Sequence, residues 1–148
     1  MAEAIAHWIR DKIAPAAAAI LGSPARTIVT AGSYECRQRD RVPGAQLSEH
    51  SRADALDLRD LKLANGTVVD LTGKAASGEF RELVRRSACN TFTTVLGPGS
   101  DSSHNDNIHL DLIERKGGYR ICEWDVLSVP EVGSSLSPKQ PHATTGAR

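Results

Sequence analysis

Three residues of this chain have side chains and a spacing suited to holding a metal ion. His50 stands seven positions before Asp57, and His109 follows much later in the chain. Asp57 and His109 each lie in a run where apolar and polar residues alternate, which is typical of a half-buried strand. Imidazole and carboxylate are ligands of Zn2+, and three protein ligands leave one position of the ion open, as in catalytic sites. We therefore take these three residues as candidate zinc ligands.

Each candidate ligand also has an ordinary alternative. His50 and Asp57 could form a surface ion pair, because their spacing is common, and His109 could be a hydrogen-bonded histidine of the core. If the histidines bind a metal, the ring N–H groups that face away from it need acceptors. Three acidic residues are near in the sequence, and the sequence does not choose among them: Glu49, Asp54 and Asp111.

Apolar spacing and turn residues predict elements that would bring these side chains together. A helix is expected over residues 3–21, which Pro15 should kink or break near Ala14 and Gly22 should cap. The other expected elements are strands over 26–34, 55–63, 67–71 and 91–96, a helical turn over 48–54 capped by Ser48, and a helix over 78–90 capped by Ser77. Asn65-Gly66 should form one hairpin, and residues 108–113 and 119–124 a second across Lys116-Gly117-Gly118.

This pattern predicts an α+β fold, a small and mostly antiparallel sheet with flanking helices. A chain of 148 residues fits one core, which we assign to residues 1–126. Beyond Val126 the composition turns to serine, proline and glycine without periodicity, so residues 127–148 are expected to form a flexible tail.

The composition excludes several classes of protein. Lysine and arginine together number 18, as do aspartate and glutamate, so the net charge is zero and the basic excess of a nucleic-acid binder is missing. There is no apolar run long enough to span a membrane. Glu3 and Asp11 interrupt the apolar first twenty residues, which therefore do not form a signal peptide. We expect a monomer with no nucleic-acid partner.

The three cysteines are far apart in the sequence and form no C-x-x-C pair, so a zinc ribbon is not expected. One disulfide and one free thiol would suit an oxidising compartment, and three reduced cysteines are the alternative. The sequence leaves both open for Cys36, Cys89 and Cys122.

The segment Ser48-x-His50-x-x-Ala53-x-Ala55-x-Asp57 resembles the S-x-H-x-x-G-x-A-x-D signature of the zinc D-alanyl-D-alanine carboxypeptidases and endopeptidases, which share a hedgehog-like zinc fold. The chain is more similar still to the extensin-like, C-terminal domain branch. That second likeness rests on five segments: Ser33-Tyr34-x-Cys36-Arg37, Leu47-Ser48-Glu49-His50, Thr94-Val95-Leu96-Gly97-Pro98, His109-Leu110-Asp111 and the late Cys122. The resemblance extends from the first helix to about Glu123.

The resemblance implies roles for the candidate residues. It makes His50, Asp57 and His109 the ligands of Zn2+, and it places Asp106 where relatives carry a glutamate base in E-x-x-H. Arg37 would steady the substrate carbonyl. His104 and Tyr34 are the candidate substrate-binding residues.

The sequence departs from the zinc peptidase pattern at three positions. Ala53 replaces a glycine, Asn107 replaces the first histidine of the frequent H-x-H pair, and Asp106 is one methylene shorter than glutamate.

We expect a zinc-dependent metallopeptidase that hydrolyses peptide bonds of peptidoglycan stem peptides or cross-links, in the periplasm or cell envelope. The alternative is a catalytically degenerate, zinc-containing module that binds the cell wall.

Overall fold

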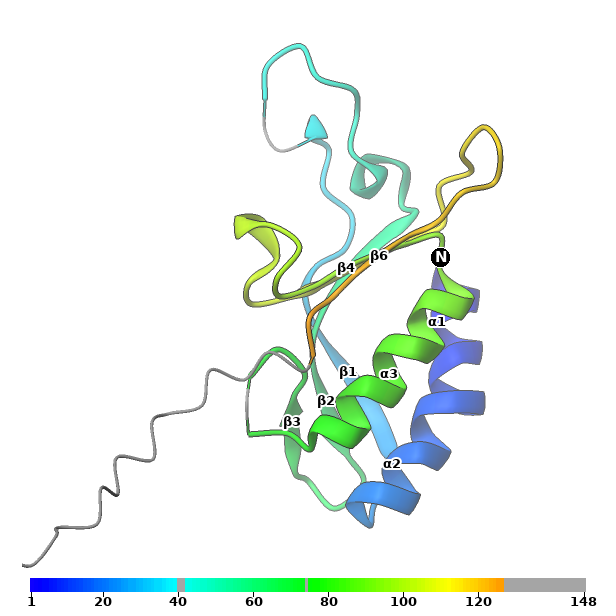
Figure 1. The fold of residues 1–148 in the computed structure, drawn as a ribbon, viewed down its shortest axis with the longest axis vertical. Coiled ribbons are helices and arrows are strands. Elements are labelled where there is room, and N and C mark those ends of the chain that lie inside the picture. Colours follow the sequence, from blue (N-terminus) through cyan, green and yellow to red (C-terminus); the bar gives the residue numbers. More distant parts are fainter. Residues whose placement is uncertain (40–41, 74, 127–148) are drawn as a thin grey trace, which may run out of the picture.

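The computed structural model describes residues 1–39, 42–73 and 75–126. Within these residues, helices cover one side of a six-stranded sheet, as Figure 1 shows. The strands lie in the order β1-β2-β5-β4-β6, and β3 pairs with β2 off this path. Neighbouring strands run antiparallel except for the parallel pair β4 and β6, which confirms the predicted α+β fold with a mostly antiparallel sheet. The helices are α1 (Ala2–Trp8), α2 (Ala14–Leu21) and α3 (Gly78–Thr91), and the strands are β1 (Ala25–Gly32), β2 (Ala55–Leu63), β3 (Val68–Asp70), β4 (Thr94–Leu96), β5 (Ile108–Asp111) and β6 (Ile121–Glu123).

The first helix continues past Pro15 instead of breaking there. A π-helical segment, Ile9–Ile13, joins α1 to α2, and the N–H of Ala14 bonds the carbonyl of Ile9. Proline lacks an N–H, and its ring crowds the carbonyl four residues before it. The wider π-helical turn just before Pro15 makes room for the proline ring and does not need its missing N–H. The disruption predicted near Ala14 therefore takes the form of a π-helical segment, and Gly22 ends the helix with a φ of 74°.

Most other local predictions are confirmed. A 3-10 turn over Glu49–Arg52 begins at Ser48, β2 has the bounds that its alternation predicts, and Ser77 caps α3. The Asn65-Gly66 turn joins β2 to β3, whose pairing places Leu61 opposite Val69. The predicted tail, residues 127–148, lies outside the described residues, and its flexibility stays a prediction.

The predicted hairpin of residues 108–113 with 119–124 is wrong. Gly117 and Gly118 do form a turn with positive φ, but β6 does not pair with β5. β4 lies between them, pairing antiparallel with β5 and parallel with β6. Alternation identified both strands correctly, but it carries no information on which strand is the neighbour.

The helices pack on the sheet through alternate residues of its central strands. Trp8 donates its ring N–H to Ser87 Oγ over 2.8 Å and meets Phe92 edge-to-face with ring centroids 5.4 Å apart. The strand residues buried in this core include Leu56 and Leu58 of β2, Val95 of β4, and Ile108 and Leu110 of β5. Because side chains alternate along a strand, Asp57 and His109 must face the opposite side of the sheet.

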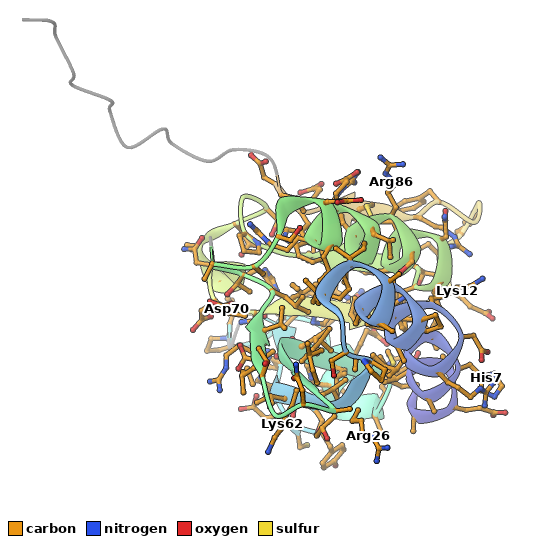
Figure 2. The ribbon with its side chains drawn as sticks, turned by 90° about the horizontal axis from the view of Figure 1, so that it is seen from below. His7, Lys12, Arg26, Lys62, Asp70 and Arg86 are labelled. Carbon is orange, nitrogen blue, oxygen red and sulfur yellow. A yellow bond between two sulfur atoms is a disulfide. The ribbon has the colours of Figure 1, made fainter. Side chains whose placement is uncertain are left out.

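The outer surface of the first helix is remote from that side. His7 and Lys12 point outward from it, as Figure 2 shows, and both are exposed. Among the described helices, none combines the length and the apolar character needed to cross a membrane.

A disulfide joins Cys89 at the end of α3 to Cys122 in β6, while Cys36 is free and exposed. The bridge ties the edge strand β6 to the helix that precedes its partner β4. This selects the disulfide-plus-thiol alternative that the sequence left open.

We expect reduction of the Cys89–Cys122 bridge, which closes a separation of 33 residues, to lower the free energy of unfolding by about 3–4 kcal/mol. Urea unfolding of the wild type and Cys122→Ala, with and without reductant, measures this. Cys36→Ser is the control and should unfold like the wild type. An unchanged midpoint in Cys122→Ala would contradict a stabilising bridge.

Candidate functional site

The register of β2 and β5 places two of the candidate ligands side by side. Asp57 and His109 are direct partners across the antiparallel pair. Side chains of directly opposite residues lie on the same face, with Cβ atoms roughly 4.5–5.5 Å apart. His109 Nδ1 lies 3.1 Å from Asp57 Oδ1. The pairing of two strands that are distant in sequence therefore brings together two of the three side chains of the cluster.

The 3-10 turn in front of β2 delivers the third side chain. Ser48 Oγ accepts the N–H of His50 over 3.3 Å, which starts the turn. Ala53 ends it in the left-handed region with φ 57°, a conformation that costs an alanine roughly 1–2 kcal/mol and a glycine almost nothing. A glycine, which stands at this position in the signature that the segment resembles, would avoid this cost. His50 consequently leans over the start of β2, with its side chain only 3% exposed.

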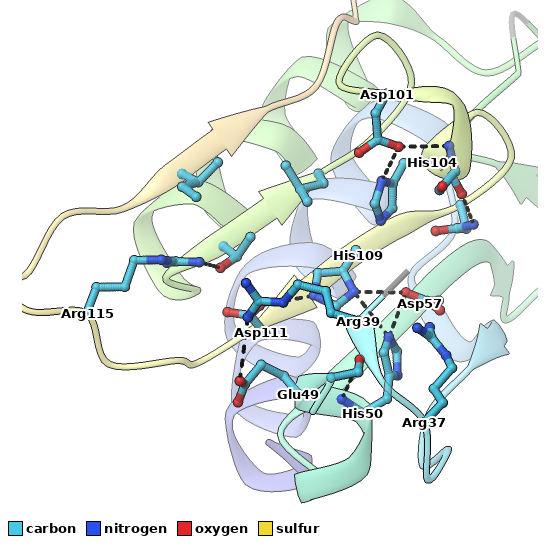
Figure 3. A pocket seen from close by; sticks show the side chains of 16 residues that line it. Arg37, Arg39, Glu49, His50, Asp57, Asp101, His104, His109, Asp111 and Arg115 are labelled. Carbon is cyan, nitrogen blue, oxygen red and sulfur yellow. Dashed lines mark hydrogen bonds and ion pairs between the residues drawn. The ribbon is translucent and has the colours of Figure 1, made fainter. Parts of the chain in front are cut away.

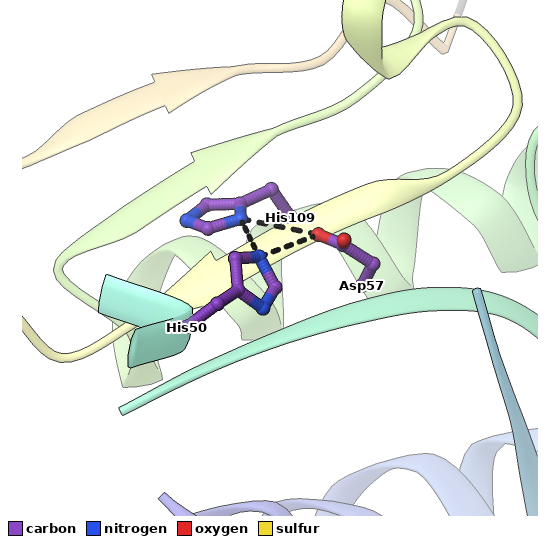
Figure 4. A group of neighbouring side chains, drawn as sticks. All are labelled: His50, Asp57 and His109. Carbon is purple, nitrogen blue, oxygen red and sulfur yellow. Dashed lines mark hydrogen bonds and ion pairs between the residues drawn. The ribbon is translucent and has the colours of Figure 1, made fainter. Parts of the chain in front are cut away.

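Three potential ligand atoms converge in this cluster, as Figure 4 shows. His50 Nε2 lies 3.2 Å from His109 Nδ1 and 3.3 Å from Asp57 Oδ1, and the third distance is 3.1 Å. In a tetrahedral site with ligand bonds of roughly 2.0–2.1 Å, neighbouring ligand atoms lie roughly 3.3–3.4 Å apart. The spacing therefore fits one face of a zinc tetrahedron.

The hydrogen bonds behind the rings decide which nitrogen faces the cluster. His50 Nδ1 contacts the Ser33 carbonyl, which can only accept, so Nδ1 carries the proton and Nε2 presents a lone pair. His109 Nε2 lies 3.0 Å from Asp111 Oδ2, which leaves the lone pair of Nδ1 for the cluster. Both imidazoles thus have the outer acceptor that metal-binding histidines usually have. Of the three acidic candidates, Asp111 fills this role, whereas Asp54 lies near the N-terminal amine and Glu49 near Arg39.

Without a metal, the cluster attracts a proton. Burial lowers the pKa of His109, but hydrogen bonds to Asp111 and Asp57 outweigh it and raise that pKa to about 9. Burial raises the pKa of Asp57, and hydrogen bonds from His109 and His50 outweigh it and hold the pKa well below its usual range. A cation between these groups is therefore favourable, whether it is a proton or a metal ion.

Gly32 leaves room for the Asp57 carboxylate. It pairs with Asp57 across β1 and β2, and a Cβ at this position would lie 2.9 Å from Asp57 Oδ2. A larger residue would push the carboxylate away from the histidines. The glycine of the Gly32-Ser33-Tyr34 segment thus shapes the cluster, while Ser33 orients His50.

A cavity of about 470 Å³ opens over the cluster. Figure 3 shows the side chains that line it. Of the residues predicted for catalysis or binding, Arg37 and His104 line it with the three cluster residues. Arg37 contacts Glu35 over 2.6 Å, and His104 contacts Asp101 over 2.8 Å.

Two predicted site residues lie elsewhere. Asp106 is exposed, accepts a hydrogen bond from the Asn107 amide over 3.1 Å, and is not among the residues that line the cavity. Tyr34 is also outside the lining, with 66% of its surface exposed. Their proposed roles stay predictions.

Several lining residues were not predicted to take part in the site. Asn107 shares a face of the chain with His109, and its Oδ1 is buried without a hydrogen-bond partner in the described structure. The period of two that marks β5 as a strand could have identified Asn107 as a neighbour of His109 on the same face, and could have singled out Asp111 among the three candidate acceptors. Asp101 and Arg115 lie in loops, and there is no sequence pattern that would have placed them.

A family model described as "Extensin-like protein C-terminus" matches residues 1–123. Neither the curated proteins nor the solved structures gave a match.

In metal-free protein we expect the His109 ring to titrate near pH 9, because two carboxylates hold its proton. The folded pKa lies above the unfolded value of about 6.5, so this stabilisation is complete below pH 6.5 and is lost as the pH rises through about 9. Asp111→Asn should lower the pKa of His109, which NMR of the ring protons measures. Asp101→Asn, whose carboxylate contacts His104 instead, is the control. An unchanged pKa in Asp111→Asn would contradict the hydrogen bond.

Proposed function

The chain belongs to the extensin-like protein C-terminus family, and we propose that it is a zinc-dependent peptidase that hydrolyses peptide bonds in the stem peptides or cross-links of peptidoglycan. The observation that carries the proposal is the convergence of three potential ligand atoms within 3.3 Å of one another, while the outer nitrogen of each imidazole contacts a hydrogen-bond acceptor. Such a set suits Zn2+ and leaves it an open position. The substrate class rests on the resemblance to the zinc D-alanyl-D-alanine peptidases.

A zinc ion held by His50, Asp57 and His109 would supply Lewis-acid chemistry, lowering the pKa of a water and polarising a carbonyl. The protein's own groups would do the rest. Arg37 would donate hydrogen bonds to the carbonyl oxygen as negative charge develops on it. Glu35 orients this guanidinium by pairing with it over 2.6 Å.

Proton transfer has two candidates. The resemblance assigns it to Asp106, which is exposed and does not line the cavity. His104 does line the cavity, its ring centroid lies 5.7 Å from that of His109, and Asp101 orients it. We therefore propose His104 as the group that receives the proton and passes it to the leaving amine.

The disulfide is compatible with an extracellular or envelope location, where thiols are oxidised. We propose the periplasm or cell envelope, since the substrate would be found there.

A second candidate function is a zinc-containing module that binds the cell wall without cleaving it. The observation that favours it is the exposed position of Asp106, which leaves the cavity without the acidic base that the resemblance implies. Incubation of zinc-loaded protein with purified peptidoglycan separates the two functions. Released peptides, detected by mass spectrometry, support the peptidase; tight binding without release supports the module.

We expect the metal-free protein to bind about one Zn2+ per chain. Because the raised pKa keeps a second proton on the His109 ring at neutral pH, binding of Zn2+ at pH 7 should release about one proton. The affinity for Zn2+ should therefore rise between pH 7 and 9. Calorimetry in buffers of different ionisation enthalpy measures both. His50→Ala should abolish binding, and Asp111→Asn should weaken it by about 10–100-fold.

His7→Ala is the matched control for this experiment, because His7 is exposed on α1 and remote from the cluster. Full zinc binding by His50→Ala would contradict the proposed ligand set of His50, Asp57 and His109.

We expect His104→Gln to lower turnover by about 10²–10⁴-fold while zinc binding persists, because a positioned acid–base group contributes about that much. Asp106→Asn should have the smaller effect. Steady-state rates on isolated muropeptides, normalised to bound zinc, measure both variants. A larger loss of turnover in Asp106→Asn than in His104→Gln would show that Asp106, and not His104, transfers the proton.

A further inference from the structure

Three arginines line the cavity, and one of them differs from the other two. Arg37 contacts Glu35 over 2.6 Å, and Arg39 lies 3.9 Å from Glu49. In the described part of the chain, Arg115 has no carboxylate within ion-pair distance. Its positive charge is therefore available to an anion that enters the cavity.

Arg115 is nevertheless held in place. Its Nη1 donates to the Thr93 carbonyl over 3.1 Å, and its Nη2 donates to Thr94 Oγ1 over 2.6 Å. The guanidinium carbon lies 5.4 Å from the centre of the Tyr119 ring. A guanidinium has five N–H donors, so these contacts leave several free. The side chain is a fixed cation with spare donors, which is the form that binds carboxylates well.

The strand register gives the position of this cation relative to the cluster. Thr94, which Arg115 contacts, is the partner of Asp111 across β4 and β5, and Asp111 stands two residues after His109. Two strand residues span roughly 7 Å. In Figure 3, Arg115 lies to the left of His109 and His104 lies above it, so the cation and the His104 imidazole reach the cavity from different directions.

We infer that Arg115 binds the free α-carboxylate of a peptide whose last residue is removed, which makes this site a carboxypeptidase and not an endopeptidase. A carboxylate one residue beyond the hydrolysed bond lies roughly 3.4 Å further along an extended chain. A charge-assisted N–H···O contact adds roughly 2.8 Å. Together the two distances span roughly 6 Å. The separation along β5 between His109 and Asp111, the partner of Thr94, is similar at roughly 7 Å. This inference rests on the proposed function and specifies its substrate.

The test compares two stem pentapeptides that differ only at the C-terminus, one a free carboxylate and the other a carboxamide. With zinc-loaded wild type, we expect kcat/KM to favour the carboxylate by about 10–100-fold, the usual effect of a hydrogen-bonded charge. Arg115→Met should bring this ratio close to one, and Arg115→Lys should leave an intermediate value. The ratio does not depend on the fraction of active protein, so it separates recognition from damage to the fold.

Arg120→Met is the matched control. Arg120 is also an arginine bound to backbone carbonyls, those of Cys89 and Asn90, but it does not line the cavity. This variant should keep the wild-type ratio. A wild type without preference, or an Arg115→Met variant with the wild-type preference, would overturn the inference.

Failure of the proposed function would give a different result, namely hydrolysis of neither peptide and no release of peptides from purified peptidoglycan by zinc-loaded protein. Release from peptidoglycan with both pentapeptides intact would overturn the carboxypeptidase inference alone. When neither peptide is hydrolysed and nothing is released, calorimetric binding of the same two peptides decides the role of Arg115. Tighter binding of the carboxylate, lost in Arg115→Met and kept in Arg120→Met, supports the anion site without any turnover. Equal binding of the two peptides overturns it.

Discussion

The cluster of His50, Asp57 and His109 brings three electron-rich atoms together in a partly buried place. The electrostatic repulsion among these atoms constrains the rest of the site. His50 Nε2, His109 Nδ1 and Asp57 Oδ1 lie 3.1–3.3 Å apart, and the outer nitrogen of each ring contacts an acceptor. A cation among its members stabilises such a group, and the two carboxylates that raise the pKa of His109 favour a proton in this place when there is no metal. The acceptors behind the rings, the Ser33 carbonyl and Asp111, therefore matter as much as the ligands.

The alternation of side chains along each strand keeps this cluster on the face of the sheet opposite to the hydrophobic core. On β5, Ile108 and Leu110 face the helices, whereas His109 and Asp111 face the cavity. A slip of one residue between β2 and β5 would exchange the two sets. It would expose the apolar residues and bury charges among the helices, so the hydrophobic core also enforces the Asp57–His109 register.

These facts explain what the sequence could and could not predict. Alternation identified β2 and β5, and it was sufficient to expect Asp57 and His109 on one face. The same alternation places Asp106, three residues before His109, on the opposite face. The resemblance to E-x-x-H nevertheless favoured Asp106 as the base. The ring acceptors depend on loop geometry, since the carbonyl of Ser33 offers no side-chain signal.

The order of the strands in the sheet was the larger failure of the sequence-based prediction. Alternation and turn residues are local features, whereas strand pairing joins segments that are distant in the sequence. The insertion of β4 between β5 and β6 also has a consequence for the cavity. In a hairpin, residues 114–118 would form a tight turn beyond the end of β5, and Arg115 would have no neighbouring strand to contact. Because β4 intervenes, the connection must pass the start of this strand, where Arg115 bonds Thr93 and Thr94. The Cys89–Cys122 bridge fixes β6 on the far side of β4, so the feature that sequence reasoning missed is the one that brings a cation to the cavity.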